Sequence, residues 1–168
     1  NAQRLLQGRG AFTDDLRFEG MLHARVRRAG VPHGILKSLD VSRARQLEGV
    51  AAVLTHHDIP RVVYSTAGQS DPMPGPQDTF SLDHKVRFVG DRVAFVAAET
   101  EEIAERALEL IEVEYEELPG VFSVAEAMQK GAPAIHEDGN ICKHMVHEVG
   151  DVEESRKRCA HVVSGHFE

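Results

Sequence analysis

The sequence predicts an α+β fold, with small mixed sheets and two or three packed helices. Two observations predict it. Several segments of strand length alternate apolar and polar residues, and other segments with helical spacing of apolar residues begin at a capping residue. At 168 residues the chain has the length of one domain and can bury roughly 70% of its unfolded surface. We therefore expect residues 1–168 to form a single domain.

The first two predicted strands are residues 21–27 and 35–41. In the first, Leu22, Ala24 and Val26 share one side, and histidine and arginine side chains occupy the other. The second repeats this period of two, which is typical of a half-buried strand. The Gly/Pro-containing residues between them supply a turn.

A short helix and a third strand follow. Ser42 is the expected N-cap of a helix over residues 42–49, and Gly49 suits the left-handed position that closes a helix. The apolar run over residues 50–55 comes directly after it and predicts a strand. This part of the chain therefore forms a strand, helix, strand unit.

Residues 56–83 break every periodic pattern. Four prolines and two glycines interrupt the segment, and such a composition indicates a loop. Long loops inside compact domains are uncommon and are usually functional or held by a partner. We expect this loop, residues 56–83, to be a contact element.

After the loop, the sequence predicts a β-hairpin. Residues 86–89 and 92–98 are apolar strands on either side of a turn at Gly90 and Asp91. Thr100 then caps a helix over residues 101–110, which leads into an alternating strand over residues 111–118 with its glutamates facing outward.

The last third of the chain is less regular. A short helix is expected over residues 124–129, and Asp151 with Glu154 predicts a capping box for a second helix over residues 152–160. Residues 161–168 alternate again and predict a strand. Because this strand comes at the end of the chain with no turn after it, we expect the chain to be a fragment of a longer protein.

Charge excludes one class of function. The chain has 19 Lys and Arg against 27 Asp and Glu, for a net charge of −8. Residues 99–117 contain nine glutamates and one arginine, so the acidic excess is one solvated face of a helix and a strand. Such a face repels nucleic acid, and we predict no nucleic-acid partner.

Composition also bears on location. Apolar runs fall short of the ~20 residues that a membrane helix needs, so no membrane partner is expected. The first residues lack the pattern of a secretory signal, and two cysteines, Cys142 and Cys159, are typical of a reducing compartment. We predict a cytoplasmic location, and whether these cysteines form a bridge stays open.

Catalytic signals are weak throughout the sequence. Cys142, His144, His147 and Cys159 are suitable metal ligands, but they have neither the Cys-x-x-Cys nor the His-x(3–5)-His spacing of zinc sites. The patterns of a phosphate-binding loop and of a nucleophile elbow are also missing from the sequence. We predict no catalytic, cofactor-binding or metal-binding residue in this chain.

Several separated blocks resemble the first domain of the molybdopterin-binding large subunit in the xanthine dehydrogenase and aldehyde oxidase family. That domain is the α/β hammerhead. The blocks include FTDD, EGMLHA, GVAAVLTHHDIP, VRFVGDRVAFVAAET and VEYEELP, which occupy residues 12–15, 19–24, 49–60, 86–100 and 113–119. The sequence departs from the family pattern at residues 28–30 and at Asp91, and these departures leave the subfamily open.

The resemblance implies a function that lies mostly outside this chain. Family members hydroxylate an aldehyde or an N-heterocycle with water as the oxygen source, and they pass electrons through 2Fe–2S clusters, commonly to FAD. The molybdopterin–molybdenum centre and the catalytic glutamate follow the hammerhead. The resemblance therefore implies an oxidoreductase parent, partners in its molybdenum, iron–sulfur and flavin parts, and no activity for the fragment alone. It leaves open whether the substrate is xanthine, a purine analogue, an aldehyde or carbon monoxide.

Two other interpretations stay open at the level of the sequence. The chain could be an independent binding domain that uses the long loop and the acidic face to recognise a partner. Alternatively, it could be a small metalloenzyme built on Cys142, His144, His147 and Cys159.

Overall fold

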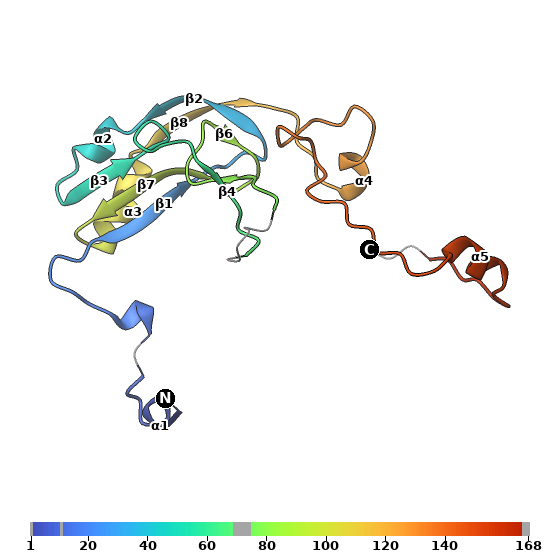
Figure 1. The fold of residues 1–168 in the computed structure, drawn as a ribbon. Helices are drawn as coiled ribbons and strands as arrows, with labels where there is room; N and C mark the ends of the chain where they lie inside the picture. The colour runs from blue at the N-terminus through green and yellow to red at the C-terminus, as the bar shows by residue number, and fades with distance from the viewer. Residues whose placement is uncertain (1, 11, 69–74, 166–168) are drawn as a thin grey trace.

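The body of the chain consists of small antiparallel sheets with one covering helix. The computed structural model describes residues 2–10, 12–68 and 75–165. One sheet has the order β1 (His23–Arg28), β7 (Arg92–Ala98), β3 (Val50–Leu54), and a second has the order β6 (Lys85–Val86), β2 (Gly34–Asp40), β8 (Glu112–Glu117). A two-stranded ribbon joins β4 (Val63–Tyr64) and β5 (Thr79–Phe80). These small sheets and few helices confirm the predicted α+β class (Figure 1).

Strand β7 is the centre of the first sheet because both of its edges are paired. Val26 of β1 lies opposite Phe95, and Val53 of β3 lies opposite Val96, with every pairing antiparallel. A strand between two others that also packs under a helix has little contact with water. Its nearly continuous apolar sequence, RVAFVAA, follows from that position.

The second sheet confirms the predicted alternation in β8 but not in β2, where the register shifts between Leu36 and Ser38. Leu36 and Leu39 of β2 lie opposite Tyr115 and Val113 of β8. These apolar side chains pack toward the core, and the glutamates of β8 are exposed. The predicted glutamate face is therefore confirmed for this strand.

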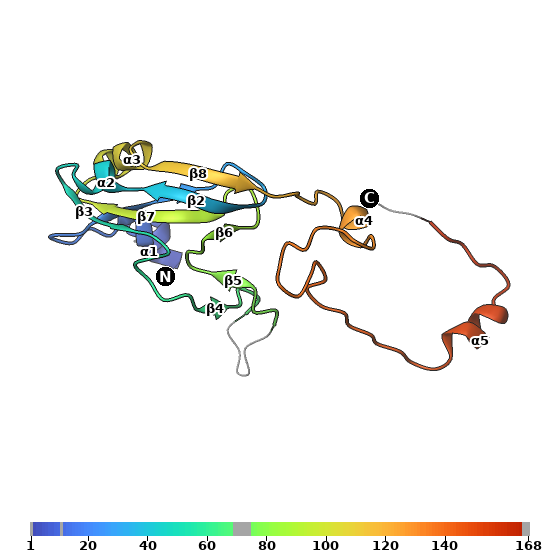
Figure 2. The same ribbon diagram turned by 90° about the horizontal axis from the view of Figure 1, so that it is seen from above.

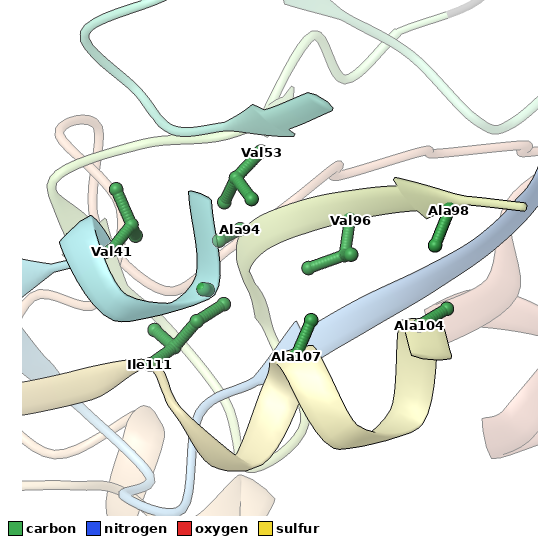
Figure 3. Close-up of a cluster of buried hydrophobic side chains, with 9 residues drawn as sticks. Val41, Val53, Ala94, Val96, Ala98, Ala104, Ala107 and Ile111 are labelled. Carbon is green, nitrogen blue, oxygen red and sulfur yellow. The ribbon is translucent and has the colours of Figure 1, made fainter. Parts of the chain in front are cut away.

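Helix α3 (Glu101–Glu109) covers the first sheet. Its N-cap is Thr100, whose Oγ1 accepts a hydrogen bond from the Ile103 backbone N–H at 3.2 Å, as predicted. Ala104 and Ala107 face the sheet with no exposed surface, and these small side chains let the helix pack closely against Val96 and its neighbours (Figure 3).

The preceding short helix, α2 (Ser42–Arg45), is confirmed, but its predicted cap is wrong. Ser42 is the first helical residue, and its backbone N–H donates to Oδ1 of Asp40 at 2.8 Å. This bond lowers the pKa of Asp40. Gly49 has the expected positive φ of +82°, and a Cβ there would lie 2.7 Å from Ile103 Cδ1.

The predicted hairpin around Gly90 is also wrong. A turn does form, with the Asp91 N–H donating to the Phe88 carbonyl, but β6 pairs with β2 and β7 pairs with β1 and β3. Gly90 N–H donates to the Ala29 carbonyl, and Ala29 N–H donates to the Asp91 carbonyl, both at 2.8 Å. Because the end of β1 takes these backbone groups, the turn passes the chain from one sheet to the other.

The long loop over residues 56–83 is more ordered than predicted, because it contains β4 and β5. Val63 lies opposite Phe80, and Tyr64 lies opposite Thr79. β-branched and aromatic residues at these positions favour extended pairing. The prolines that signalled a loop lie at residue 60 and between the two strands, and residues 69–74 are outside the described part of the chain.

Beyond β8 the chain leaves the body (Figure 2). Helix α4 (Val124–Ala127) is capped by Ser123, and helix α5 (Val152–Lys157) is capped by Asp151, whose Oδ1 accepts from the Glu154 N–H at 2.8 Å. Both helices were predicted. The predicted strand over residues 161–168 is wrong for residues 161–165, which have no strand partner among the described residues, and residues 166–168 lie outside them.

Two short helices near the start of the chain complete the described elements. Helix α1 (Ala2–Leu6) and the short 3₁₀ helix η1 (Thr13–Asp15) precede β1, and both are exposed. Within the described residues, no helix combines the length and the apolar character needed to cross a membrane.

Candidate functional site

The four residues considered as metal ligands do not form a site. Cys142, His144, His147 and Cys159 are all exposed, and both cysteines are free thiols. In the described part of the chain, no three or more His, Cys, Asp or Glu side chains are grouped so that they could hold a metal ion. The small-metalloenzyme interpretation therefore has no ligand set in the structure.

The acidic face is a solvated surface. Glu101 pairs with Arg25 of β1 at 2.6 Å, and Glu112 pairs with Arg43 of α2 at 3.1 Å. All four side chains are a third or more exposed, and such pairs contribute little to stability. This face is not a candidate for acid–base chemistry.

The structure instead brings charges together at the base of the long loop. Asp83, which ends that loop, is buried with a side chain only 4% exposed. Arg61, from the start of the loop, donates to it through Nε at 3.0 Å and Nη2 at 3.3 Å. Arg87, which follows β6, donates through Nη2 at 2.9 Å, and the His84 backbone N–H donates at 2.9 Å. One carboxylate thus fixes both ends of the loop.

These contacts set the charge state of Asp83. Burial by itself would raise the pKa of this carboxyl, but the hydrogen bonds from Arg61 and Arg87 outweigh burial and lower the pKa. Asp83 is therefore an anion at neutral pH. It serves as a structural counter-ion for the two arginines.

An aromatic ring and a third arginine anchor the β4–β5 ribbon. The guanidinium carbons of Arg61 and Arg87 lie 4.1 and 5.0 Å from the centre of the Phe80 ring, which is within the range of cation–π attraction. Arg92 at the start of β7 donates to the Tyr64 hydroxyl and to the Phe80 carbonyl, both at 2.8 Å. The ribbon is thereby tied to the central strand.

A cavity of about 650 Å³ opens beside this cluster. One wall consists of Phe80 from the ribbon together with the side chains of Arg61 and Arg87. Residues 136–142 supply the facing wall. Glu137 on this wall accepts from Arg61 Nη2 at 3.3 Å, so the two walls are joined.

The facing wall is held in shape by Asn140. Its Nδ2 donates to the carbonyls of Pro133 at 2.9 Å and Ala127 at 3.3 Å, and its Oδ1 accepts from the Ile135 N–H at 3.0 Å. Burial, together with the charge of Arg87, lowers the pKa of His136 on the same wall. His136 is therefore largely neutral at pH 7.

The cavity is suited to recognition. Its two arginines are paired, Arg61 with Asp83 and Glu137 and Arg87 with Asp83, and Arg87 Nε is buried without a hydrogen-bond partner among the described residues. The arginine side chain is itself only 8% exposed. Such a surface can accept a partner group.

Sequence reasoning expected the loop over residues 56–83 to matter but did not identify the residues that organise it. Arg61 and Asp83 are 22 positions apart, and Arg92 and Tyr64 are 28 positions apart. No spacing rule joins residues at such separations. The sequence contained one indication, the length of the loop, because long loops in compact domains are usually functional or are held by a partner.

The comparisons with known proteins agree with this architecture. Residues 7–119 match the family described as "Aldehyde oxidase and xanthine dehydrogenase, a/b hammerhead domain". The nicotinate dehydrogenase large molybdopterin subunit of Eubacterium barkeri is 41% identical over 161 residues, which cover 94% of this chain and 36% of that protein. The xanthine dehydrogenase molybdenum-binding subunit of Escherichia coli is 34% identical over 165 residues, which cover 96% of this chain and 22% of that protein.

Comparison with a solved structure shows that the similarity extends to the fold. The crystal structure of a Cu,Mo-containing CO dehydrogenase superposes with a TM-score of 0.67 at 35% identity, and the match covers 82% of this chain and 17% of that chain. The present chain thus spans about a third or less of the length of each of these relatives. The chain belongs to the aldehyde oxidase and xanthine dehydrogenase family, and it contains the α/β hammerhead domain of that family.

Proposed function

We propose that this chain is the hammerhead-containing module of a molybdopterin-dependent hydroxylase, within a large subunit that continues beyond residue 168. The observation that carries the proposal is the 41% identity to a large molybdopterin subunit over 161 residues, together with the small share of that subunit which the chain spans. The parent enzyme is an oxidoreductase. Its molybdopterin–molybdenum centre supplies the hydroxylation chemistry, and 2Fe–2S clusters and FAD on other parts carry the electrons away.

The role of the module in this proposal is structural. No residue of the chain is assigned to catalysis, to a cofactor or to a metal, and the fragment by itself is inactive. Relatives named for nicotinate, xanthine and carbon monoxide share this domain, which supports a scaffold common to enzymes with different substrates. The substrate of the parent is therefore determined outside the shared body of the domain.

The contact element is the loop over residues 56–83 with its cavity. In the parent, this loop faces the molybdenum domains and a neighbouring iron–sulfur or flavin part. Support comes from the Asp83 cluster, which ties Arg61 at the start of the loop to Asp83 at its end, and from the 650 Å³ cavity beside it. The parent functions in the cytoplasm, and the free, exposed cysteines support this location. It has no nucleic-acid or membrane partner.

The decisive first experiment is to determine the full reading frame and to purify the complete large subunit. We expect several hundred further residues and bound molybdopterin. Hydrogen exchange should then show residues 56–68 and 75–83 to be more protected in the complete enzyme than in residues 1–168 alone. Equal exchange in the two samples would refute the loop as the contact element.

A second candidate function is a stand-alone binding domain. The cavity favours it, because buried Arg87 leaves its Nε without a partner beside an open space. A reading frame that ends at residue 168, together with a small molecule or peptide that binds there, would support this function over the first.

A further inference from the structure

Three histidine rings lie together where the two ends of the loop over residues 56–83 meet. The ring centre of His56 lies 3.9 Å from that of His57 and 6.5 Å from that of His84. His56 and His57 are the first residues of the loop, and His84 comes directly after its last residue, Asp83. The histidine cluster, His56, His57 and His84, therefore joins the start of the loop to its end.

Backbone hydrogen bonds position the rings of the cluster. The first two rings belong to a turn in which the Asp58 N–H donates to the Thr55 carbonyl at 3.0 Å. The Thr55 N–H and its Oγ1 both donate to Asp58 Oδ2 at 2.7 Å. On the other side, the His84 carbonyl accepts from the Leu36 N–H of β2 at 2.7 Å. The turn over residues 55–58 thus holds His56 against a ring that is bound to the second sheet.

His56 is the ring of the cluster that is least able to take a proton. It is half-buried, whereas His57 and His84 are exposed, and its Nδ1 is buried without a hydrogen-bond partner among the described residues. Burial, followed by the charges that the two neighbouring rings can carry, lowers the pKa of His56, and Asp83 and Asp58 only partly oppose this effect. His56 is therefore neutral at pH 7.

The two nearby carboxylates already have cationic partners. Asp83 accepts from Arg61 and Arg87, and Asp58 pairs with Arg45 at 3.0 Å. Hydrogen bonds lower the pKa of both carboxyl groups, so both are already anions at neutral pH and do not gain charge when the solution becomes mildly acidic. A proton on His56 therefore adds a positive charge to a region whose negative charges are already paired.

We propose that the histidine cluster is a pH-sensitive latch, in which protonation of His56 below neutral pH opens the turn over residues 55–58 and separates the start of the loop from its end. A protonated His56 in the closed turn would hold a buried N–H at Nδ1 without an acceptor, beside two rings that gain charge in the same pH range. In the open turn the ring reaches water. The inference does not rest on the proposed function, because the turn and the rings belong to this chain.

The direction and the limit of the effect follow from proton linkage. A base whose pKa is lowered in the closed state stabilises that state above its ordinary pKa of about 6.5, and the stabilisation is lost as pH falls through this value. In the open turn at pH 5.5, protonated His56 outnumbers the neutral form by about tenfold. The equilibrium constant for opening can therefore rise by at most about tenfold between pH 7.5 and pH 5.5.

Hydrogen exchange of residues 1–168, followed by NMR at pH 7.5 and pH 5.5, tests the latch. The Thr55 and Asp58 amides report the turn, because both are hydrogen-bonded within it. Each rate is divided by the intrinsic rate at the same pH to give the opening constant. We expect this constant to rise severalfold in acid for the turn, and to stay unchanged for the amides of β7.

Matched variants assign the effect to one ring. His56→Gln removes the titrating group and should abolish the rise in the opening constant of the turn. His147→Gln, which changes an exposed histidine far along the chain, should leave the rise intact. His136→Gln is the second control, because burial and Arg87 lower the pKa of His136 as well, but this ring lies on the wall of the cavity. It should also leave the rise at the turn intact.

A direct titration keeps the inference testable if His56→Gln does not fold. The ring protons of His56 in the unchanged chain should report a pKa below the ordinary value of about 6.5, and a value at or above it would refute the latch. An opening constant of the turn that changed by less than about twofold would also refute it. An equal rise in His56→Gln would assign the effect to another group, and an equal rise for β7 would show global unfolding in place of a local latch.

Discussion

Replacing Asp83 with asparagine should destabilise the body by about 3 kcal/mol, because it leaves a buried guanidinium without its counter-ion. Breaking one side of a buried ion pair costs about 3–5 kcal/mol. The lower end applies here because Arg61 is 44% exposed and can turn toward water, whereas Arg87 is only 8% exposed and cannot. Only one of the two arginines is thus left both charged and buried.

Thermal unfolding of residues 1–168 measures this effect. For a chain of this length, a loss of about 3 kcal/mol lowers the melting temperature by roughly 6–12 °C. The matched control is Glu137→Gln, which also removes a carboxylate bonded to Arg61, but from a side chain that is 78% exposed. This control should cost less than about 0.5 kcal/mol, because exposed pairs contribute little.

A second substitution separates the unpaired charge from the loss of packing. Adding Arg87→Met to Asp83→Asn removes the buried charge and should recover most of the lost stability. The reasoning would be refuted if Asp83→Asn melted within about 0.5 kcal/mol of the parent sequence, or if the double variant were as unstable as the sum of its single changes.

The same network predicts a pH dependence. Burial alone would raise the pKa of Asp83, but the hydrogen bonds from the two arginines keep it below its ordinary value. A carboxyl with a lowered pKa in the folded state contributes stability that is fully present above the unfolded pKa of about 3.9 and is lost as pH falls through the folded pKa. The stability difference between the parent sequence and Asp83→Asn should therefore be constant near pH 7 and shrink below a pH of about 4. A difference that stayed constant down to a pH of about 2.5 would contradict this assignment.

Three further substitutions test the body of the domain in the same unfolding assay. Gly90→Val should cost about 1–3 kcal/mol through backbone strain, because φ is +92° and an added Cβ meets no atom within 4 Å. Gly30→Ala, also in open space but without a positive φ, should be near neutral, and equal effects of the two would refute the strain argument. Ala107→Leu should cost about 1–3 kcal/mol by overpacking a side chain with no exposed surface, and an unchanged melting temperature would show that the helix can move off the sheet. Thr100→Ala should cost about 1 kcal/mol through loss of the N-cap, with Thr100→Ser close to neutral as its control.

The parts of the fold that could be predicted from the sequence are those with a local cause. Alternation of side chains marked β8 because Val113 and Tyr115 pack toward the core and the glutamates between them are exposed. Thr100 marked the start of α3 because its side chain bonds to a backbone group three residues away. In each case the pattern and its cause lie within one element.

The incorrect predictions have distant causes. The turn at Gly90 has the expected positive φ, but its backbone bonds to Ala29, about sixty positions earlier, and the flanking strands enter different sheets. The Asp83 cluster depends on Arg61 and Arg87 meeting one carboxylate, which no local period records. Such pairings exist only once the sheets have formed.

The predicted strand over residues 161–168 is a different kind of error. The cluster at Asp83 and the turn at Gly90 find their partners inside this chain, so the structure corrects the prediction by showing those partners. Residues 161–165 have strand-forming valines but no partner in the described chain, and Val163 is left almost fully exposed. A strand propensity without a neighbouring strand cannot be satisfied, because an isolated strand leaves its backbone groups unpaired. The valines of residues 161–165 therefore have strand propensity without a neighbouring strand among the described residues, which is why the local pattern predicted a strand that the structure does not contain there.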